Sequence, residues 1–263
     1  LTWKVVGSVP VFDTVGVYGD VENNVIHHNY FGIFTYGGQD MNFINNEVYD
    51  NVKYGIDPHD DSDYLLIDNN NVHNNGNHGI ICSQRCNNIT VTNNISSYNI
   101  GNGIMLHRNV TDSLVQNNNI HHNTDSGIAI FDSHNNTALN NTSDYNSNGL
   151  RVSVGSSGNT VEDNIFSNNT KYGLYFYKGS DTPTSGDGKP KLNTFRNNEV
   201  KSNTSVAIKL NDADSNIFES NTITGNSSYV FEINNANSNI FDNNITSSNT
   251  YNYYYSKTNG INT

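Results

Sequence analysis

The stretch Asn45-Asn46-Glu47-Val48-Tyr49-Asp50-Asn51, followed by Tyr54-Gly55-Ile56, is one unit of a repeat that runs through most of the chain. Six Asn-Asn pairs recur at spacings of 22, 24, 24, 24 and 23 residues, and the same period returns downstream. They end at Asn24, Asn46, Asn70, Asn94, Asn118 and Asn141, and later at Asn198, Asn221 and Asn244. A glycine before an aliphatic residue keeps the same period, so the chain is a series of similar coils.

The repeat predicts an all-β fold, a right-handed parallel β-helix. Each unit holds stretches of three to five strand-forming residues that end at Asn, Gly or Ser, without helical periodicity. Leucine-rich repeats have a similar length, but this chain is poor in Leu. Stacked coils hydrogen-bond at about 4.8 Å. Asn tolerates left-handed corners, and its amide stacks as a ladder when coils are in register. We therefore expect most Asn residues to be structural.

The organisation predicted is one β-helix domain over residues 1–263. The beat breaks only between about 178 and 192, where two of the four Pro and three Gly lengthen one coil, which predicts a surface loop on the binding face. Near the end the repeat dissolves into a tyrosine-rich run, which predicts a cap at about 247–263. The chain starts at Leu1 without a charged and apolar leader, so we expect a mature or trimmed product.

Composition excludes several classes of protein. The 263 residues carry a formal net charge of -12, with 34% hydrophobic and 14% charged residues, and Asn makes up about a fifth. So few Lys and Arg argue against a nucleic-acid partner. The lack of an apolar run of about 18 residues argues against a membrane-spanning helix. The two cysteines, Cys82 and Cys86, are too few for a disulfide framework and are expected to be buried.

Counting from the repeat's glycine separates the two faces of one strand. The first and third residues after it are mostly aliphatic and should point inward, so the second and fourth should point outward. The outward positions are Phe34, Asp57, Ile81, Met105, Ala129, Arg151 and Tyr175, and then Tyr36, His59, Ser83, His107, Phe131, Ser153 and Tyr177. Aromatic, His and Arg side chains therefore gather on one face of a chain that is otherwise poor in charge.

An elongated face with aromatic rings and spaced cations suits an acidic polysaccharide. Sugar C–H faces stack on Tyr and Phe, and uronate carboxylates fit the fork of Arg. The predicted substrate-binding residues are Tyr36, His78, Arg85, His107, Arg108, Arg151, Tyr175 and Lys178. The alternative is that the aromatic residues only stabilise the sheet. That alternative leaves the cations unexplained.

The densest cluster of reactive side chains runs from Lys53 to Asp61. Asp57 and His59 share the outward face, and Tyr54 stands at the entrance of the strand. A carboxylate beside a His orients the ring and keeps it basic, while Tyr donates or accepts a proton. Pro58 has no backbone N–H, so it removes one hydrogen-bond donor from the middle of the predicted strand. A residue that is unfavourable for its strand in this way is typical of functional positions. We therefore predict Tyr54, Asp57 and His59 as the catalytic residues.

The stretch Tyr54-Gly55-Ile56-Asp57-Pro58-His59-Asp60 resembles the Tyr-Gly-Phe-Asp-Pro-His signature of the mannuronan (alginate) C5-epimerases. The similarity continues through His78-Gly79-Ile80-Ile81-Cys82-Ser83 to about Lys178, and it is closer to the periplasmic polymer-level branch. The resemblance implies a parallel β-helix that converts β-D-mannuronate to α-L-guluronate within a polymer. It implies that Tyr54 and His59 form the acid/base pair on opposite faces of the sugar, with Asp57 orienting His59.

This chemistry needs a positive or hydrogen-bonding group for the substrate carboxylate, because the C5 proton is very weakly acidic. Arg85 or His78 is expected to supply it, with Arg108 and Arg151 binding neighbouring sugars. Two departures from the family bear on this. Ser83 stands where the modular secreted enzymes carry a further Asp, and Gln84 separates Ser83 from Arg85 where the periplasmic branch has Arg directly.

Other functions remain open on the sequence. A polysaccharide lyase shares the first step and then expels the 4-O substituent. A non-catalytic glycan-binding or surface solenoid belongs to another class. A glycoside hydrolase is disfavoured because no paired carboxylates recur on the outward positions. We expect no cofactor and assign no metal ligands, although Asp60-Asp61-Ser62-Asp63 leaves calcium open. The expected protein is a monomer in an extracellular, cell-surface or periplasmic location.

Overall fold

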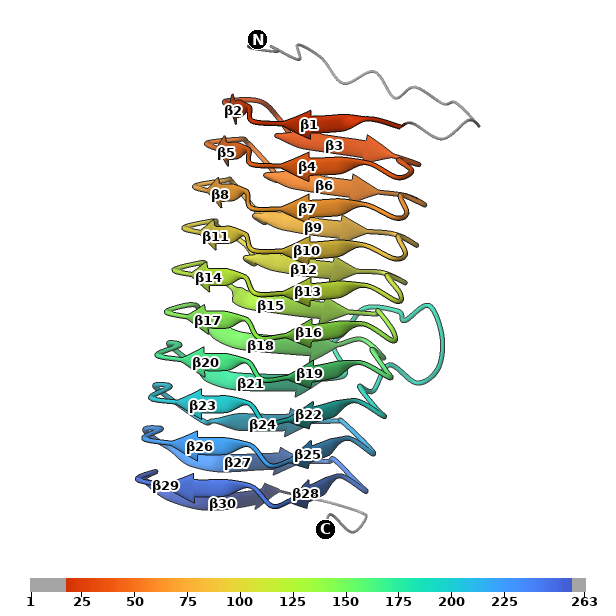
Figure 1. Ribbon diagram of the computed structural model, residues 1–263. Coiled ribbons are helices and arrows are strands. Elements are labelled where there is room, and N and C mark those ends of the chain that lie inside the picture. Colours follow the sequence, from red (N-terminus) through yellow and green to blue (C-terminus); the bar gives the residue numbers. More distant parts are fainter. Residues whose placement is uncertain (1–17, 257–263) are drawn as a thin grey trace.

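The computed structural model describes residues 18–256, which form thirty β-strands wound into stacked coils (Figure 1). Each coil gives one strand to each of three parallel sheets of ten strands. The described residues contain no helix, and thus none of the length and apolar character needed to cross a membrane. The predicted all-β parallel β-helix is confirmed.

The three sheets run the length of the solenoid. The first comprises β1 (Asp20–Glu22), β4 (Asn42–Ile44), β7 (Leu66–Asp68), β10 (Thr90–Thr92), β13 (Leu114–Gln116), β16 (Thr137–Leu139), β19 (Thr160–Glu162), β22 (Thr194–Arg196), β25 (Ile217–Glu219) and β28 (Ile240–Asp242). The second comprises β2 (Val25–His27), β5 (Glu47–Tyr49), β8 (Asn71–His73), β11 (Ile95–Ser97), β14 (Asn119–His121), β17 (Thr142–Asp144), β20 (Ile165–Ser167), β23 (Glu199–Lys201), β26 (Thr222–Thr224) and β29 (Ile245–Ser247). The third comprises β3 (Ile33–Tyr36), β6 (Ile56–His59), β9 (Ile80–Ser83), β12 (Ile104–His107), β15 (Ser126–Phe131), β18 (Asn148–Ser153), β21 (Tyr172–Tyr177), β24 (Ile208–Asn211), β27 (Tyr229–Asn234) and β30 (Tyr251–Ser256).

The core fills the space between the sheets. The first residue after each repeat glycine is buried in one continuous apolar cluster, as at Ile56, Ile80 and Ile104, which are 0% exposed. The third residue joins the same cluster, as at Cys82 and Leu106. The inward and outward alternation predicted from the glycines is therefore confirmed. Cys82 and Cys86 are both buried and free.

Asparagine ladders hold the corners between the sheets. The backbone N–H and the side-chain amide of Asn94 both donate to Oδ1 of Asn118, at 2.9 and 3.0 Å. The Asn118 amide in turn donates to the Val91 carbonyl and to Asn141. A parallel ladder runs at the next corner through Asn51, Asn75, Asn99, Asn123 and Asn146. The expected amide stacking is confirmed, and it pairs polar groups that would otherwise be buried without partners.

Each corner also needs an unusual backbone. Asn45, Asn69 and Asn93 precede the first ladder with φ of 57°, 53° and 55°, the left-handed region that Asn tolerates. Gly55 is required for space and not for its backbone angle. A Cβ there would lie 2.3 Å from Val72 Cγ1 and 2.6 Å from the Gly79 carbonyl oxygen. The glycine before the third sheet therefore lets the chain pass close to the next coil.

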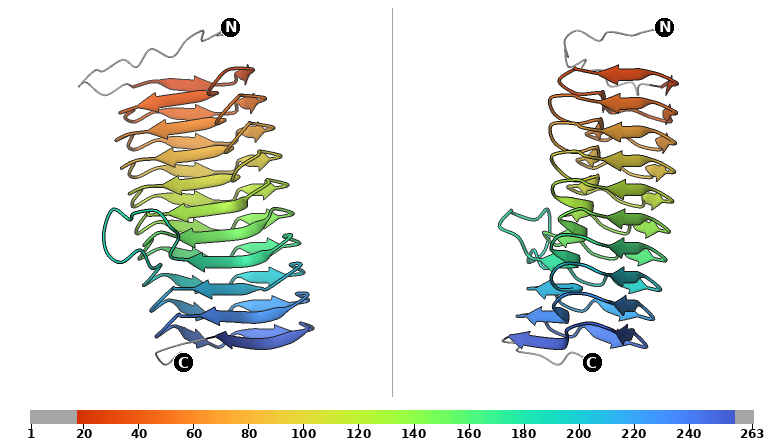
Figure 2. Two further views of the ribbon diagram at one scale, coloured as in Figure 1. Left: turned by 180° about the vertical axis from the view of Figure 1, so that it is seen from behind. Right: turned by 90° about the vertical axis from the view of Figure 1, so that its left-hand side faces the viewer.

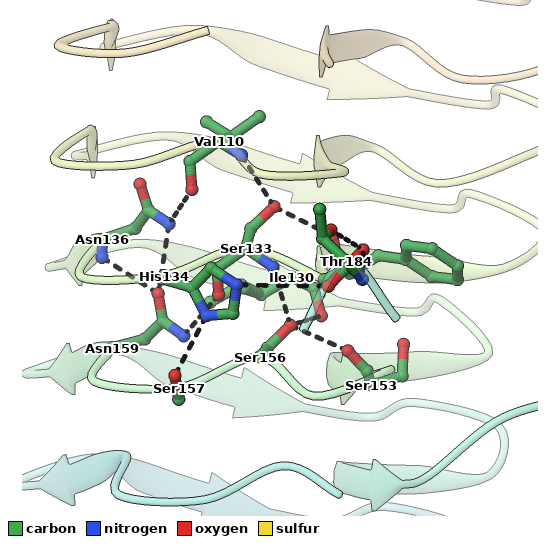
Figure 3. Close-up of polar contacts among 12 residues, drawn as sticks. Val110, Ile130, Ser133, His134, Asn136, Ser153, Ser156, Ser157, Asn159 and Thr184 are labelled. Atoms are coloured by element: carbon green, nitrogen blue, oxygen red, sulfur yellow. Dashed lines mark hydrogen bonds and ion pairs between the residues drawn. The ribbon is translucent and has the colours of Figure 1, made fainter. Parts of the chain in front are cut away.

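The long insertion joins β21 to β22 and stands out from the solenoid (Figure 2). It folds back toward earlier coils. The Thr184 N–H donates to Oδ2 of the buried Asp132 at 2.9 Å, and its hydroxyl bonds the same oxygen. Figure 3 shows Thr184 near Ser133, which follows Asp132 in the turn after β15. The Gly155 N–H donates to the Gly188 carbonyl at 2.7 Å. These bonds place the insertion along the C-terminal ends of the third-sheet strands.

At the other end of the chain, residues 251–256 continue the third sheet as β30, which pairs with β27. The predicted cap at about 247–263 therefore starts at the end of β29 and includes this last strand. Its remaining residues, 257–263, lie outside the described part of the chain. The extent of the domain over residues 1–263 stays a prediction.

Candidate active site

One column of outward side chains forms the floor of the candidate site. Register across the third sheet aligns neighbours from β3 to β21 in the order Phe34, Asp57, Ile81, Met105, Ala129, Arg151 and Tyr175. Ile81, Met105 and Ala129 belong to a second apolar cluster that Tyr54 packs against. Although these three residues face away from the core, they are at most 5% exposed. The floor is therefore a dry apolar strip with a polar group at each end.

Asp57 is the polar group at the first end. Its side chain points outward from β6, yet the residue is 1% exposed and neither carboxylate oxygen has a hydrogen-bond partner among the described residues. Burial raises the pKa of Asp57 to about 8, and the nearby Ser83 hydroxyl offsets only part of that rise. Asp57 is therefore a neutral carboxylic acid at pH 7, with an O–H to donate. An unpartnered buried polar group of this kind fits a site that a ligand completes.

His59 takes its orientation from a different carboxylate. Its Nδ1 lies 2.6 Å from Oδ2 of Asp60. A carboxylate accepts, so we assign the ring proton to Nδ1, which leaves Nε2 as the basic nitrogen. The expectation that Asp57 orients His59 is wrong. The backbone of Asp60 has φ of 40°, and this left-handed turn brings its carboxylate back to the ring, whereas Asp57 stands two residues away along the strand.

Arg85 holds Asp60 from the other side. Its Nη2 lies 2.9 Å from Asp60 Oδ1, and its Nε lies 2.8 Å from Asp61 Oδ1. The expected substrate-binding guanidinium is thus engaged by two carboxylates, and its contact with the site runs through Asp60. Gln84, which separates Ser83 from Arg85, places its amide nitrogen 3.4 Å from His59 Nε2. The extra residue therefore puts an amide, and not a cation, beside the basic nitrogen.

Tyr54 and His78 form the opposite edge of the site. Their rings stack with centroids 5.3 Å apart and an interplanar angle of 3°. Burial is the main cause that raises the pKa of Tyr54, and the nearby Asp57 is the second, so the phenol is protonated at neutral pH. The Asn102 N–H donates to His78 Nδ1 at 2.9 Å, which leaves the proton on Nε2. Burial is the main cause that lowers the pKa of His78 to about 4, and the positive charge of Arg151 is the second. His78 is thus a neutral donor, and the expected positive charge is missing there.

The other predicted binding residues line the same sheet. Tyr36 is the Cα neighbour of His59 on β3, and its side chain is 44% exposed. His107 is half-buried at the end of β12, where burial, with Arg108 next, lowers its pKa to about 4. Arg108 lies over the Phe131 ring and 3.7 Å from Asp181 of the insertion. Lys178 is exposed and begins the insertion.

The remaining pair lies farther along the solenoid. Arg151 and Tyr175 are Cα neighbours on β18 and β21 and line a depression together with Asp125, Asn148, Lys171 and Tyr172. The structure thus separates the predicted residues into one group near Tyr54 and His59 and a second group around Arg151 and Tyr175. Sequence reasoning missed Asp60, Asp125, Asn148 and Lys171. Asn148 stands one place before a repeat glycine, as Tyr54 and His78 do, and Asp125 and Lys171 stand two places before one, so reading the residues ahead of each glycine would have found them.

No three His, Cys, Asp or Glu side chains within residues 18–256 come together in a group that could hold a metal ion. Asp60 and Asp61, two members of the acidic run, instead face Arg85. Tyr54, Asp57 and His59 offer a protonated phenol, a neutral carboxyl and an imidazole whose Nε2 is the basic nitrogen, which are the kinds of group that acid–base chemistry uses.

The buried Asp57 predicts how stability depends on pH. An unfolded Asp ionises near pH 4, whereas folded Asp57 keeps its proton to about pH 8. Between these values the folded state holds a proton that the unfolded chain has lost, so stability falls as pH rises through this window and levels off above it. We expect Asp57→Asn to show a smaller fall in Tm from pH 5 to 8 and a higher Tm than the unsubstituted protein at pH 8. The exposed Asp112→Asn is the control, and equal falls in all three proteins would contradict the burial argument.

Comparison with known proteins places the chain in a family. Residues 10–112 and 59–189 match the family described as the right handed beta helix region. The chain belongs to this right-handed β-helix family. The handedness expected for the coils is thereby confirmed. No curated protein sequence matches the chain.

Solved structures share the fold of this β-helix. The periplasmic alginate epimerase AlgG is 23% identical with a TM-score of 0.71, over 91% of this chain and 51% of that one. The A-module of the Azotobacter vinelandii mannuronan C-5 epimerase AlgE6 is 17% identical with a TM-score of 0.79, over 93% and 73%. An alginate lyase from Paenibacillus is 13% identical with a TM-score of 0.54, over 90% and 92%. The chain spans about half the length of AlgG. Its fold is the one found in the alginate epimerases, the family that its sequence resembles.

Proposed function

We propose that this chain is an enzyme that acts on an acidic polysaccharide and inverts C5 of β-D-mannuronate within the polymer. The observation that carries the proposal is the buried, unpartnered Asp57 carboxyl, which lies on β6 with His59, two residues after the end of the turn that holds Tyr54. Support also comes from the fold, which this chain shares with alginate epimerases.

The first step neutralises the substrate carboxylate. As a neutral acid, Asp57 donates a hydrogen bond to the C6 carboxylate of the bound sugar, in a dry site where such a bond is strong. This interaction takes the place that the sequence analysis gave to Arg85 or His78. Withdrawing charge from the carboxylate makes the C5 proton more acidic and stabilises the enolate-like intermediate.

The next steps move one proton off C5 and another onto it. His59 Nε2 takes the C5 proton, and the resulting imidazolium is stabilised by Asp60, which Arg85 holds in place. The Tyr54 phenol then donates its proton to C5 from the opposite face, which inverts the centre. His59 releases its proton to water and Tyr54 regains one before the next turnover. Loss and gain of one proton leave the polymer chain unbroken.

The runner-up reaction is β-elimination, in which the same intermediate expels the 4-O substituent and the chain breaks. An alginate lyase and a pectate lyase share the fold, which supports keeping this alternative. Incubation with polymannuronate separates the two reactions. We expect a guluronate anomeric signal by NMR with no shortening of the chains. Ultraviolet absorbance from unsaturated chain ends would show that the reaction is elimination and not epimerisation. Binding without either product would favour a non-catalytic solenoid.

The proposal extends to the setting of the reaction. The acid, the base and the group that neutralises the carboxylate are all side chains, so we assign no metal or cofactor to the site. The proposed partner is an acidic polysaccharide, and we propose that the protein is a monomer. A polysaccharide substrate of this kind fits an extracellular, cell-surface or periplasmic location, and AlgG is a periplasmic protein.

A further inference from the structure

Gln84 is a polar side chain beside the proposed base that the mechanism above does not use. It follows the last residue of β9, and its amide nitrogen lies 3.4 Å from His59 Nε2. That nitrogen is the one proposed to take the C5 proton of the sugar. The Gln84 side chain is half-buried. Its amide is therefore next to the place where the removed proton arrives.

The backbone of Gln84 is fixed from both sides, whereas its amide group is free to rotate. The Gln84 N–H donates to the His107 carbonyl at 2.8 Å, and the Gln84 carbonyl accepts from the Asp61 N–H at 3.1 Å. Gln84 and Arg85 have φ of 58° and 65°, so the chain makes a left-handed turn directly after β9. Within residues 18–256 the amide has one hydrogen-bond partner, His59, which leaves rotation about the Cγ–Cδ bond open.

An amide differs from a cation at this place because it carries an acceptor as well as donors. Asp60 holds the ring proton of neutral His59 on Nδ1, so Nε2 accepts and the Gln84 N–H faces it. After Nε2 has taken a proton it becomes a donor. A half-turn of the amide then brings Oε1 to the same place, since the two ends of an amide are alike in size. A guanidinium or an ammonium has donors alone and would repel the imidazolium.

The proton on Nε2 bears on the choice between epimerisation and elimination. In elimination the C4–O4 bond breaks as the C4–C5 double bond forms, and O4 takes up a proton. O4 and the C5 hydrogen of β-D-mannuronate lie on the same face of the ring, so the imidazolium of His59 is an acid on the side of O4. Epimerisation instead needs His59 to keep its proton while Tyr54 protonates C5 from the other face. We infer that Gln84 holds the proton on His59 Nε2 and thereby favours epimerisation over elimination. This inference rests on the proposed function.

Other ionisable groups also act on the charge of His59, and they come from its own coil and from the neighbouring ones. They are Asp57, Asp60 and Asp61 from its own coil, Tyr36 from β3, Arg85 from the turn after β9 and His107 from β12. A substitution of Gln84 leaves all of these groups in place. A change in the protonation of His59 that is confined to Gln84 variants therefore reports on the amide itself.

The test compares the products that Gln84 variants make from polymannuronate. Gln84→Leu removes the acceptor, and we expect unsaturated chain ends to increase at least about tenfold relative to guluronate, the scale of one hydrogen bond to a charged group. Gln84→Glu keeps an acceptor, so the product ratio should stay within about twofold. Its carboxylate favours the imidazolium, so the acid limb of the profile of kcat against pH should move up by about one pH unit.

Gln116 provides the matched controls for both variants. It also ends a strand, β13, but it lies on the first sheet. We expect Gln116→Leu and Gln116→Glu to keep the product ratio and the pH profile of the unsubstituted protein. Both Gln84 substitutions keep the backbone hydrogen bonds of that residue, and the use of two variants keeps the test valid if one fails to fold.

The outcomes separate this inference from the proposed function. An unchanged product ratio in Gln84→Leu, including an equal loss of both products, overturns the inference while the epimerase proposal stands. Unsaturated ends as the main product of the unsubstituted protein overturn both. If the unsubstituted protein modifies no uronan, the proposed function fails, and the pKa of His59 measured by NMR then tests the proton-holding contact alone. A pKa about one unit higher in Gln84→Glu, and unchanged in Gln116→Glu, would support the contact. Equal pKa values in the two variants would overturn it.

Discussion

Replacing His59 by Asn is expected to lower kcat on polymannuronate by about 10²–10⁴-fold, the usual contribution of a positioned general base. The reason is local. His59 Nδ1 is hydrogen-bonded to the Asp60 carboxylate at 2.6 Å, which leaves Nε2 as the basic nitrogen. Asn fills similar space but cannot take the C5 proton at neutral pH. Initial rates of guluronate formation, followed by NMR at saturating polymer, measure the effect.

His73→Asn is the matched control for this experiment. His73 also ends a strand, β8, and stacks on Tyr49 with centroids 5.1 Å apart, but it lies on the second sheet. We expect its variant to keep kcat within about twofold, since surface substitutions away from special features change little. Full activity in His59→Asn would remove His59 from the mechanism under either epimerisation or elimination.

Replacing Asn118 by Ala is expected to destabilise the protein by about 3 kcal/mol or more. The substitution leaves the Asn94 N–H and the Val91 carbonyl without the Asn118 side chain in a buried corner, and it removes one acceptor of the Asn94 amide. Each unsatisfied buried group costs roughly 1–3 kcal/mol. With a shift of about 2–4 °C per kcal/mol for a chain of this size, Tm should fall by at least about 6 °C.

The neighbouring residue provides the control for the ladder. Asn119 begins β14 and is exposed, so Asn119→Ala removes the same side chain one position away. Its effect should stay within about 0.5 kcal/mol. Thermal unfolding followed by far-ultraviolet circular dichroism compares the two variants. Equal losses of Tm would show that the ladder contributes no more than any surface Asn.

The chain has a negative net charge, and its proposed substrate is an anion. A row of cations along one face of the sheet does not by itself explain how the two are compatible. Periodicity places Arg85, Arg108 and Arg151 on or beside the outward face of one sheet. In the structure each of them meets an acid: Asp60 and Asp61, Asp181, and Asp125. The net positive charge along the face is therefore smaller than the sequence indicates. What remains for an anion is the neutral Asp57 and the Arg151–Lys171 depression.

Much of the architecture follows from the repeat itself. In a solenoid, residues one period apart become neighbours in space, so the spacing of Asn and Gly predicts the register of all three sheets. The alternation of a strand then separates core positions such as Ile56 from outward ones such as Asp57 and His59. For the same reason the clustering of Tyr54, Asp57 and His59 could be predicted without coordinates, because they lie within one coil.

The partners of these side chains depend on features that do not repeat. A left-handed turn at Asp60 brings a carboxylate to His59, and the inserted Gln84 moves Arg85 to the far side of that carboxylate. Burial of Asp57 under its neighbours changes an expected anion into a neutral acid. The insertion folds back to Asp132, a contact across 52 positions. Periodicity predicts where the backbone runs, whereas the charge state and hydrogen bonds of a side chain depend on the solvent that its neighbours exclude, which is a property of the packed structure.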